Sequence, residues 1–452
     1  MANASRGTHF VAIIGGATAG AEVAAQLADR GARVAVFEQN PRPFGKIEDG
    51  LPRWHVALRK KEYATISEKL ARPGIEFVPN TQVGRDVDFL ELVREWGFSA
   101  VVLANGAWRD RPLPIEGADD YVGKGLIYQN PFVIWFNHAN EKSYDGPVFE
   151  PLDDAMVVGG GLASIDVAKV LMLWTVGEKL RERGIDEDMV EMELKGIPRT
   201  LAKHDLKFED LGLAGCTIFY RRRVEDMPVT EIPEGATPER AEKARKARDK
   251  LLNKAMGKYC FRFVPLSAPD GLIVEGGRLV GLRFRRTRIE GRRVIPLDET
   301  FEQRGSCVIS SIGSIPLPMP GVPTKGELFD FADWELGRLA DFPTVFAAGN
   351  IVTGKGNIVA SRKHATQVSE AMAAAYLGLD DGAEGREALA DAVSARAAEA
   401  AAAVADGVVD LPALEDEAVE RVLARVRERQ AAVGYDSDLA AWIAKVTPAD
   451  FE

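Results

Sequence analysis

The stretch Phe10-Val-Ala-Ile-Ile-Gly15-Gly-Ala-Thr-Ala-Gly20 joins a short apolar run to a glycine-rich turn. The Ala-rich segment 21–30 follows the turn, and the order of these segments predicts a strand, a tight turn and a helix. Gly31 is placed to end this helix, and Arg33–Phe37 is a second apolar run that leads to Glu38. The stretch therefore predicts the first β-α-β unit of a doubly covered parallel sheet.

The chemistry of this turn favours a dinucleotide. Gly15 permits the tight turn, Gly20 allows the helix to pack closely on the strand, and the free N–H groups at the helix start can bind a pyrophosphate. Glu38 lies 18 residues after Gly20, where a carboxylate can bond the ribose hydroxyls of an adenosine. Ala17 departs from the pattern, because its methyl group stands where the backbone should approach phosphate. An ordinary glycine-rich turn is the alternative.

A second turn of the same kind, Gly159-Gly-Gly-Leu-Ala-Ser164, follows the apolar run Ala155–Val158. A helix is expected over Ile165–Leu173, and after a long insertion the strand Thr217–Tyr220 ends in Arg221-Arg222-Arg223. An acidic residue at this strand end favours NAD, whereas guanidinium groups bond the 2′-phosphate of NADP. The arginines therefore predict NADP(H), with a solvated basic turn as the alternative.

Length and composition exclude several classes of protein. The chain has 452 residues, of which 46% are hydrophobic and 28% charged, as expected for two or three globular domains. No apolar run approaches the ~20 residues of a membrane span and residues 1–10 do not resemble a secretion signal, so we expect a cytoplasmic protein. Three widely spaced cysteines fit neither a redox dithiol nor an iron–sulfur cluster, and we expect buried apolar thiols at Cys216, Cys260 and Cys307.

Five separated segments resemble the adrenodoxin reductase and glutamate-synthase small-subunit branch of the flavoproteins with two dinucleotide-binding domains. They are the two glycine turns, the second with Tyr220–Pro228, and the segments Pro41–His55, Ala100–Ala107 and Val345–Ile358. The resemblance covers roughly residues 8–379. It implies FAD at the first turn, NADP(H) at the second, and electron transfer through hydride delivery to flavin N5.

The fold class implied is α/β, with two Rossmann-like domains of the glutathione-reductase type. The FAD domain is expected at residues 1–112 and 333–379, and the NADP domain at 113–332. Within the NADP domain, Arg278–Arg288 and Arg292–Pro296 are expected to pair as antiparallel strands across a Glu290-Gly291 turn. A strand over Ser306–Ile312 and a Pro-rich link, residues 316–323, are expected to lead back to the FAD domain.

Residues 380–452 form an acidic helical extension with no counterpart that we can match in that family. They hold 17 acidic and 7 basic side chains, a net charge of −10 out of −11 for the chain. A helix is expected over Ala388–Ala405. An apolar stripe follows at helical spacing, formed by Val419, Val422, Leu423 and Val426. Such a stripe most often packs on its own protein; a homo-oligomer or a docked partner subunit is the alternative.

The resemblance and the turn chemistry together name the cofactor residues. FAD contacts are expected from Gly15, Ala17, Gly20, Glu38, Gly45, Ala104, Gly106, Gly349, Asn350, Gly356, Asn357 and Ile358. NADP(H) contacts are expected from Gly159, Gly161, Leu162, Ala163, Ser164, Arg221 and Arg222. The helix start near Gly356–Ile358 is expected to stabilise negative charge on the reduced flavin. No metal site is expected.

Two further side chains are catalytic candidates. His55 aligns with a histidine near the flavin in adrenodoxin-reductase relatives, where it is expected to tune the ring or assist the acceptor; packing of Trp54-His55 at a domain junction is the alternative. Glu231 is expected to position the nicotinamide ribose or to act as an acid. Lys60 and Lys61, with the arginine cluster, are candidates for a basic docking surface, although exposed lysines are usually only solubilising.

Departures from the family pattern refine the expected function. Asn350 replaces an Asp that bonds the ribityl chain in glutamate-synthase-type relatives, and the cysteine-rich iron–sulfur ligation of those subunits is missing. We therefore expect a stand-alone ferredoxin–NADP reductase-like enzyme that exchanges electrons with ferredoxin or another small carrier protein, and neither nucleic acid nor a membrane as partner. The alternatives are an electron-input subunit of a larger enzyme and a non-catalytic flavin-binding sensor or scaffold.

Overall fold

A computed structural model describes residues 8–229, 232, 235–354, 356–379, 412–449 and 451. These residues form two units. Unit 1 takes the chain up to Leu51, Val56–Arg109 and the chain from Ser314 onward, and unit 2 takes Pro52–His55 and Asp110–Gly313. In the described residues, no helix is both long enough and apolar enough to cross a membrane.

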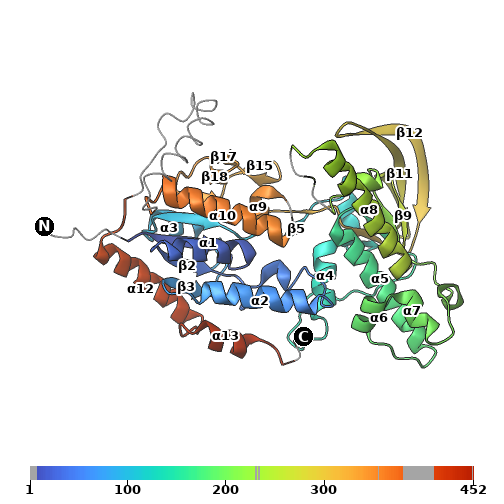
Figure 1. Cartoon of the computed structure of the whole chain (residues 1–452), viewed down its shortest axis with the longest axis horizontal. Coiled ribbons are helices and arrows are strands. Elements are labelled where there is room, and N and C mark those ends of the chain that lie inside the picture. Colours follow the sequence, from blue (N-terminus) through green and yellow to red (C-terminus); the bar gives the residue numbers. More distant parts are fainter. Residues whose placement is uncertain are drawn as a thin grey trace. The chain divides into compact units, whose positions relative to one another are not determined.

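Unit 1 is built on a five-stranded parallel sheet in the order β19-β4-β1-β2-β3 (Figure 1). The strands are β1 (Phe10–Ile14), β2 (Arg33–Phe37), β3 (Ile75–Val78), β4 (Ala100–Leu103) and β19 (Val345–Ala347). The chain runs from β1 through β2 to β3 on one side and then continues with β4 on the other. Ligands of such sheets bind where the strand order reverses, which here is the end of β1.

Helices and loops cover both faces of this sheet. Every residue of the central strand β1 is buried as a result. Val11 and Ile13 face a core shared with α1 and α10, while Phe10, Ala12 and Ile14 face a second core on the other side. The helices of unit 1 are α1 (Thr18–Asp29), α2 (Val56–Leu70), α3 (Phe89–Arg94), α9 (Asn350–Thr353), α10 (Ile358–Ala375), α12 (Asp416–Ala432) and α13 (Leu439–Val446).

Unit 2 repeats the plan with a parallel sheet in the order β6-β13-β7-β8-β9. Its strands are β6 (Leu126–Tyr128), β7 (Met156–Val158), β8 (Thr217–Phe219), β9 (Arg262–Val264) and β13 (Val308–Ser310). Its helices are α4 (Gln129–His138), α5 (Leu162–Arg181), α6 (Met189–Lys195), α7 (Ile197–Ala202) and α8 (Pro238–Tyr259). Strand β7 holds the central place that β1 holds in unit 1.

A separate antiparallel sheet in unit 2 has the order β10-β11-β12. The strands are β10 (Ser267–Glu275), β11 (Arg278–Glu290) and β12 (Arg293–Arg304). The expected antiparallel pair across Gly291 is therefore present, with β10 as an additional strand. Short strands elsewhere are β5 (Arg109–Asp110), β14 (Ser314–Ile315), β15 (Thr324–Lys325), β16 (Leu328–Phe329), β17 (Phe331–Asp333) and β18 (Arg338–Leu339).

The division into units differs from the expected domain bounds at several points. Pro52–His55 belongs to unit 2, and the preceding part of unit 1 ends at Arg109 rather than at residue 112. Unit 1 resumes at Ser314 rather than at residue 333, because Val322 and Phe329 are buried in the same core as Phe10. The described part of the C-terminal extension also belongs to unit 1 and is not a domain of its own.

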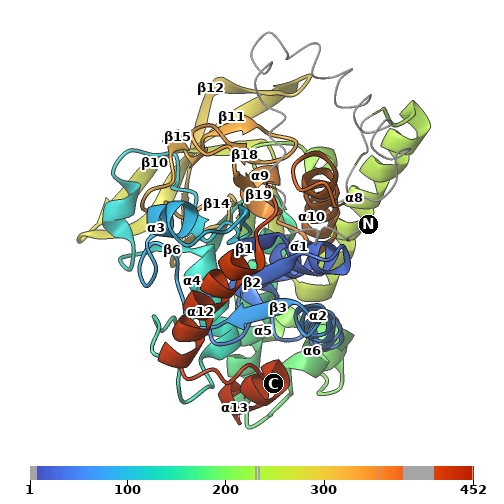
Figure 2. The ribbon, with the colours of Figure 1, turned by 90° about the vertical axis from the view of Figure 1, so that its left-hand side faces the viewer.

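The apolar stripe of the extension is buried within unit 1. Helix α12 lies along β3, and its stripe packs in the core that contains Phe10 (Figure 2); the stripe is Val419, Val422, Leu423 and Val426. An isolated bridge also joins Thr8 to Leu414. The expectation that this stripe packs on its own protein is confirmed, because its side chains are buried within unit 1. A homo-oligomer or a docked partner through the extension stays a prediction. The helix expected over Ala388–Ala405 lies outside the described residues.

We predict that Leu423→Ala lowers the stability of the protein. Leu423 is 2% exposed, so removing its branched end leaves a cavity that costs about 3 kcal/mol. The drop in the midpoint of thermal unfolding measures this effect. Leu194→Ala is the matched control, because Leu194 on α6 is 72% exposed, and it should leave the midpoint unchanged. A normal midpoint with a reduced molecular mass for Leu423→Ala would instead indicate an intermolecular contact.

Candidate functional site

In unit 1, helix α1 begins directly over the end of β1, and two glycines make this possible. A Cβ atom at Gly20 would lie 1.8 Å from the carbonyl oxygen of Gly15. Gly15 has a φ of +99°, and a Cβ atom there would lie 2.7 Å from the oxygen of Ala104. Neither position accepts a side chain, so the N–H groups at the start of α1 are presented at the switch point of the sheet.

Ala17, the departure from the glycine pattern, is accommodated by a glycine opposite it. Ala17 is the residue before α1, with φ −75° and ψ −156°, an extended conformation that any residue adopts. Gly45 has a φ of +49°, and a Cβ atom there would lie 2.8 Å from the Ala17 methyl carbon. The methyl group therefore takes space that Gly45 leaves open.

Glu38 reaches under the turn and bonds the backbone. Its Oε2 accepts a hydrogen bond of 2.8 Å from Gly16 N–H, and its Oε1 accepts one of 3.0 Å from Asn40 N–H. The side chain is buried, and burial raises the pKa of this carboxyl to about 7, although both hydrogen bonds act to lower it. Sequence reasoning placed Glu38 at the ribose position but did not find its bond to the turn.

Two side-chain oxygens at this site are buried without a partner among the described residues. They are the Oδ1 atoms of Asn105 and Asn350, which follow β4 and β19. A buried acceptor without a hydrogen bond costs about 1–3 kcal/mol, so both atoms fit a ligand that donates hydrogen bonds, such as the hydroxyl groups of a flavin nucleotide. Asn350 thus keeps the bonding capacity of the family Asp.

The returning segment after β19 adds the remaining expected residues. Gly349 has a φ of +83°, and a Cβ atom there would lie 2.6 Å from the Ala19 methyl carbon of α1. Asn357 caps α10 by accepting a hydrogen bond of 2.7 Å from Ala360 N–H, so its side chain serves the helix start. Gly106 and Gly45 both face Trp108. These contacts bring the expected FAD residues of β1, β2, β4 and β19 together in unit 1.

His364 is a residue of this site that sequence reasoning missed. Its Nδ1 accepts a hydrogen bond of 3.0 Å from Gly349 N–H, and burial lowers the pKa of the ring. The accepting nitrogen must be unprotonated, so the bond and the lowered pKa both favour the neutral imidazole. No local sequence pattern indicates this role, because the bond to Gly349 depends on where α10 packs.

In unit 2, two glycines of the second turn also leave no room for a side chain. A Cβ atom at Gly159 would lie 2.2 Å from the carbonyl oxygen of Ser311, and one at Gly160 would lie 2.2 Å from the ring of Tyr220. The buried Ser164 hydroxyl donates to the carbonyl oxygen of Ser311 at 3.1 Å, so it ties α5 to β13. At Gly161, by contrast, no atom lies within 4 Å of an added Cβ.

The arginines after β8 are not equivalent. Arg223 is paired with Asp226 at 2.8 Å and with Glu225 at 2.7 Å, and Arg222 donates to the carbonyl oxygen of Arg292 at 2.9 Å. Arg221 is exposed and pairs with no described acidic side chain. Its backbone is held by Thr287 Oγ1, which donates to the Arg221 carbonyl at 2.8 Å. Arg221 is therefore the guanidinium most available for a phosphate.

The two catalytic candidates have different outcomes. His55 lies in unit 2, with Nε2 3.9 Å from Asp166 Oδ1, and the ring of the adjacent Trp54 is buried in the core of that unit. Its catalytic assignment stays a prediction. Glu231 lies outside the described residues. Lys60 and Lys61 are exposed on α2 of unit 1, whereas the arginine cluster belongs to unit 2.

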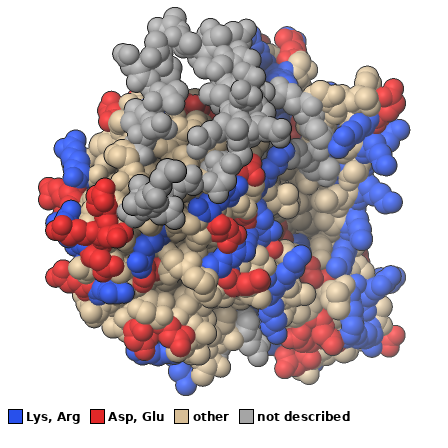
Figure 3. Space-filling view, turned by 60° about the vertical axis from the view of Figure 1, so that its left-hand side comes forward, with Lys and Arg blue, Asp and Glu red and all other residues tan. Residues whose placement is uncertain are grey.

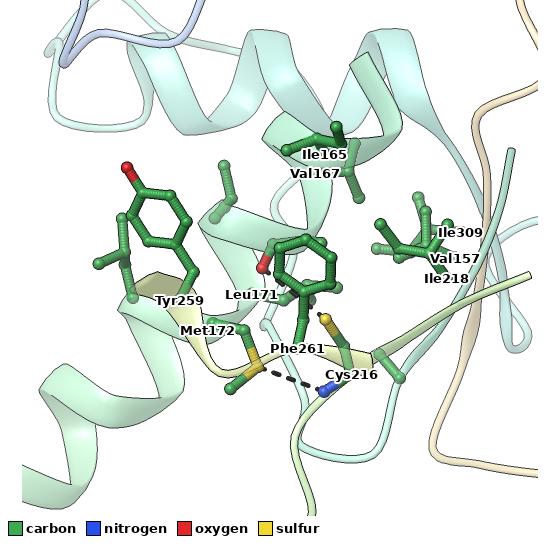
Figure 4. Close-up of a cluster of buried hydrophobic side chains, with 14 of the residues drawn as sticks. Val157, Ile165, Val167, Leu171, Met172, Cys216, Ile218, Tyr259, Phe261 and Ile309 are labelled. Atoms are coloured by element: carbon green, nitrogen blue, oxygen red, sulfur yellow. Dashed lines mark hydrogen bonds between the residues drawn. The ribbon is translucent and has the colours of Figure 1, made fainter. Parts of the chain in front are cut away.

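The three thiols lie in or beside apolar surroundings, as expected. Cys216 and Cys307 are buried, Cys260 is half-buried, and all are free. Cys216 N–H donates to Met172 Sδ at 3.2 Å within the core of unit 2 (Figure 4). Burial raises the pKa of each thiol, to about 11 for Cys260 and Cys307, so the reactive thiolate is disfavoured.

Comparisons with known proteins agree with this geometry. Residues 9–181 match the model of the pyridine nucleotide-disulphide oxidoreductase family. The chain is 24% identical over 408 residues to the mitochondrial NADPH:adrenodoxin oxidoreductase of Arabidopsis thaliana, covering 80% of this chain and 81% of that one. It is 34% identical over 163 residues to the NADPH glutamate synthase small chain of Bacillus subtilis, covering 34% and 31%.

The match to this family covers less than half of the chain. The structure of FprA from Mycobacterium tuberculosis in complex with NADPH is similar, with a TM-score of 0.63, 20% identity, and coverage of 94% of this chain and 91% of that one. The expected α/β fold with two Rossmann-like sheets is therefore confirmed, and the sequence is similar to NADPH-dependent oxidoreductases of the adrenodoxin reductase type.

We predict that Gly161→Ala weakens NADPH binding without destabilising the protein. No atom of the chain opposes a methyl group there, so only a bound pyrophosphate would meet it. NADPH affinity measured by protein fluorescence should fall about tenfold, a cost of about 1.4 kcal/mol. Gly160→Ala is the control and should lower the thermal midpoint, because its methyl group would overlap the ring of Tyr220. Unchanged NADPH affinity in Gly161→Ala would place the nucleotide elsewhere.

Proposed function

We propose that this protein is an FAD-dependent NADPH oxidoreductase that transfers electrons between NADP(H) and a small redox carrier protein. The observation that carries the proposal is the repeated geometry of the two turns. In each unit a helix begins over the central strand, at the point where the strand order reverses, and glycines leave no room for a side chain. Such a point binds a nucleotide in open α/β sheets.

The residues of unit 1 fit FAD. The helix start of α1 suits the pyrophosphate, Glu38 suits the adenosine ribose, and the unpartnered Oδ1 atoms of Asn105 and Asn350 suit ligand hydroxyls. Bound FAD supplies the conversion between the two-electron chemistry of a nicotinamide and the one-electron chemistry of a carrier. The fit of Ala17 against Gly45 removes one reason to regard the protein as a scaffold with relaxed cofactor binding.

The residues of unit 2 fit NADP(H). The turn residues Gly159, Gly161 and Ser164 suit the pyrophosphate, and Arg221 suits the 2′-phosphate because its guanidinium has no competing acidic partner among the described residues. Family members bind FAD and NAD(P)H, and Arg221 would make this protein prefer NADPH to NADH through the 2′-phosphate.

We predict that anaerobic NADPH bleaches the flavin band near ~450 nm much faster than NADH does. Arg221→Gln should raise the KM for NADPH about 30-fold and leave the KM for NADH unchanged, since charge-assisted bonds contribute about 2 kcal/mol. Stopped-flow absorbance measures both. Arg223→Gln is the matched control, because Arg223 is already paired with Asp226 and Glu225. Absence of a flavin band would refute the proposal as a whole.

Helix α8 in unit 2 supports an acidic protein as the electron partner. It carries eight Lys and Arg residues against three Asp and Glu residues, and Lys243, Lys250 and Lys254 share one face at spacings of seven and four. These three are exposed and form no ion pair with a described residue. Figure 3 shows a strip of Lys and Arg side chains along the right-hand edge of that view. Such a field steers an acidic carrier toward the surface.

We predict that charge reversal on α8 slows carrier reduction selectively. Lys250→Glu combined with Lys254→Glu should lower kcat/KM for an acidic ferredoxin about tenfold at low salt and less at high salt, because screening removes long-range attraction. NADPH-dependent reduction of ferricyanide should stay unchanged, since that reaction needs no protein docking. Reversal of Lys60 and Lys61 on α2 tests the docking surface expected from the sequence. Equal carrier rates in all variants would exclude α8 as the docking face.

A further inference from the structure

The loop between β2 and the short 3₁₀ helix Gly45–Ile47, residues 38–45, lies against the first glycine turn; we call it the cofactor loop. Glu38 at its start bonds Gly16 N–H at 2.8 Å. Pro43 lies 3.0 Å from the position of an added Cβ at Gly16, and Gly45 at its end faces the Ala17 methyl group. Both ends of the cofactor loop therefore contact the turn.

The other side of the cofactor loop is held by the C-terminal segment, residues 412–449 and 451. The indole N–H of Trp442 on α13 donates to the carbonyl oxygen of Pro41 at 2.8 Å. Arg42 donates to the carbonyl oxygen of Val446 at 3.2 Å, and its guanidinium lies 4.2 Å from the ring centre of Phe451. Arg42 is buried and also paired with Glu48, so these contacts are shielded from water.

A second set of contacts runs from α12 to the backbone of Glu38. Arg429 Nε donates to Thr81 Oγ1 at 2.9 Å, and its Nη2 donates to the Asn80 carbonyl at 3.3 Å. Thr81 N–H in turn donates to the Glu38 carbonyl at 2.8 Å, and Asn80 N–H donates to the Asn40 carbonyl at 3.3 Å. Asn40 N–H is one of the two donors that hold the Glu38 carboxylate.

We propose that the C-terminal segment sets the affinity for FAD, with Trp442 and Arg429 as positioning residues that hold the cofactor loop where Glu38 meets the adenosine ribose. The inference rests on the proposed FAD site of unit 1. The C-terminal extension would then support a cofactor site of its own chain. Figure 2 shows α12 running beside β3, the strand that pairs with β2 and ends next to this loop.

The physical reason is that the position of Glu38 depends on the segments bonded to it. Its backbone N–H donates to the Val78 carbonyl oxygen of β3 at 2.9 Å, and its own carbonyl oxygen accepts from Thr81 N–H at 2.8 Å. Its carboxylate is fixed by two backbone N–H groups, one of which, Asn40 N–H, belongs to the cofactor loop itself. Loss of the Trp442 or Arg429 bond frees the loop to shift and leaves a carbonyl or hydroxyl group without its partner. A carboxylate displaced by a fraction of an ångström bonds a ribose less well.

The test is a double-mutant cycle on the full-length, deflavinated protein, with the FAD dissociation constant measured from quenching of flavin fluorescence. Trp442→Phe keeps an aromatic ring against Tyr435 and removes only the N–H donor. We expect it to raise the dissociation constant about fivefold, the effect of one hydrogen bond. In a Glu38→Gln background, Trp442→Phe should have no further effect, because the group through which it acts is already lost.

Two variants on α12 complete the experiment. Arg429→Gln should weaken FAD binding in the same direction and provides a second route if Trp442→Phe folds poorly. Arg421→Gln is the matched control, since Arg421 is exposed and pairs only with Glu417 among the described residues, and it should bind FAD normally.

The outcomes separate this inference from the proposed function. If the unmodified protein binds FAD and Trp442→Phe and Arg429→Gln both bind it equally well, the inference alone is overturned. The inference is also overturned if Trp442→Phe raises the FAD dissociation constant by the same factor with Glu38 and with Glu38→Gln, because that result indicates general destabilisation. If the unmodified protein does not quench FAD fluorescence, the proposed function and the inference fall together.

Discussion

One steric constraint organises both units: a helix begins so close to the end of the central strand that a Cβ atom cannot fit between them. A Cβ atom at Gly20 would lie 1.8 Å from the Gly15 carbonyl oxygen, and one at Gly159 would lie 2.3 Å from the Ser164 hydroxyl oxygen of α5. The helix start can then present its free N–H groups at the edge of the sheet. Every other feature of the two sites is arranged around this approach.

The two units satisfy the constraint with different chemistry. In unit 1 a carboxylate, that of Glu38, lies under the turn and takes up one of its N–H groups. In unit 2 an aromatic ring, that of Tyr220, covers Gly160, and the hydroxyl of Ser164 bonds the neighbouring strand end. The same fold thus gives one turn an acidic lining and the other an aromatic one, followed by basic residues. This difference suits two different nucleotides.

Much of this arrangement could be predicted from local sequence. Strands β1 and β2 have the bounds expected from the sequence, because each is an apolar run closed by glycine or by Glu38. Helix α5 extends to Arg181, eight residues beyond the expected end, because Val176 and Leu180 continue its buried face. The pairing of Arg223 with Asp226 was visible in the spacing of three residues and was overlooked.

Contacts that depend on distant segments could not be predicted in this way. The bond from Gly349 to His364 requires the position of α10, and the low exposure of the Glu38 carboxylate requires the cofactor loop to fold back on the turn. The sequence predicts the apolar stripe of α12 but not the core against which it packs. Periodicity indicates which face of a helix is buried, but it does not indicate the element that covers that face.

The order in which the segments of the two units follow one another along the chain affects how the protein folds during synthesis. Residues of unit 2, Asp110–Gly313, are contiguous apart from Pro52–His55, whereas unit 1 is complete only when β19, α10 and α12 have been made. Domains fold as units while the chain leaves the ribosome, so unit 2 can close first. Until β19 (Val345–Ala347) has been synthesised, β4 is an unpaired edge of the unit 1 sheet. The N-terminal strands are therefore made first, but their sheet is among the last parts of the chain to lose an edge that can aggregate.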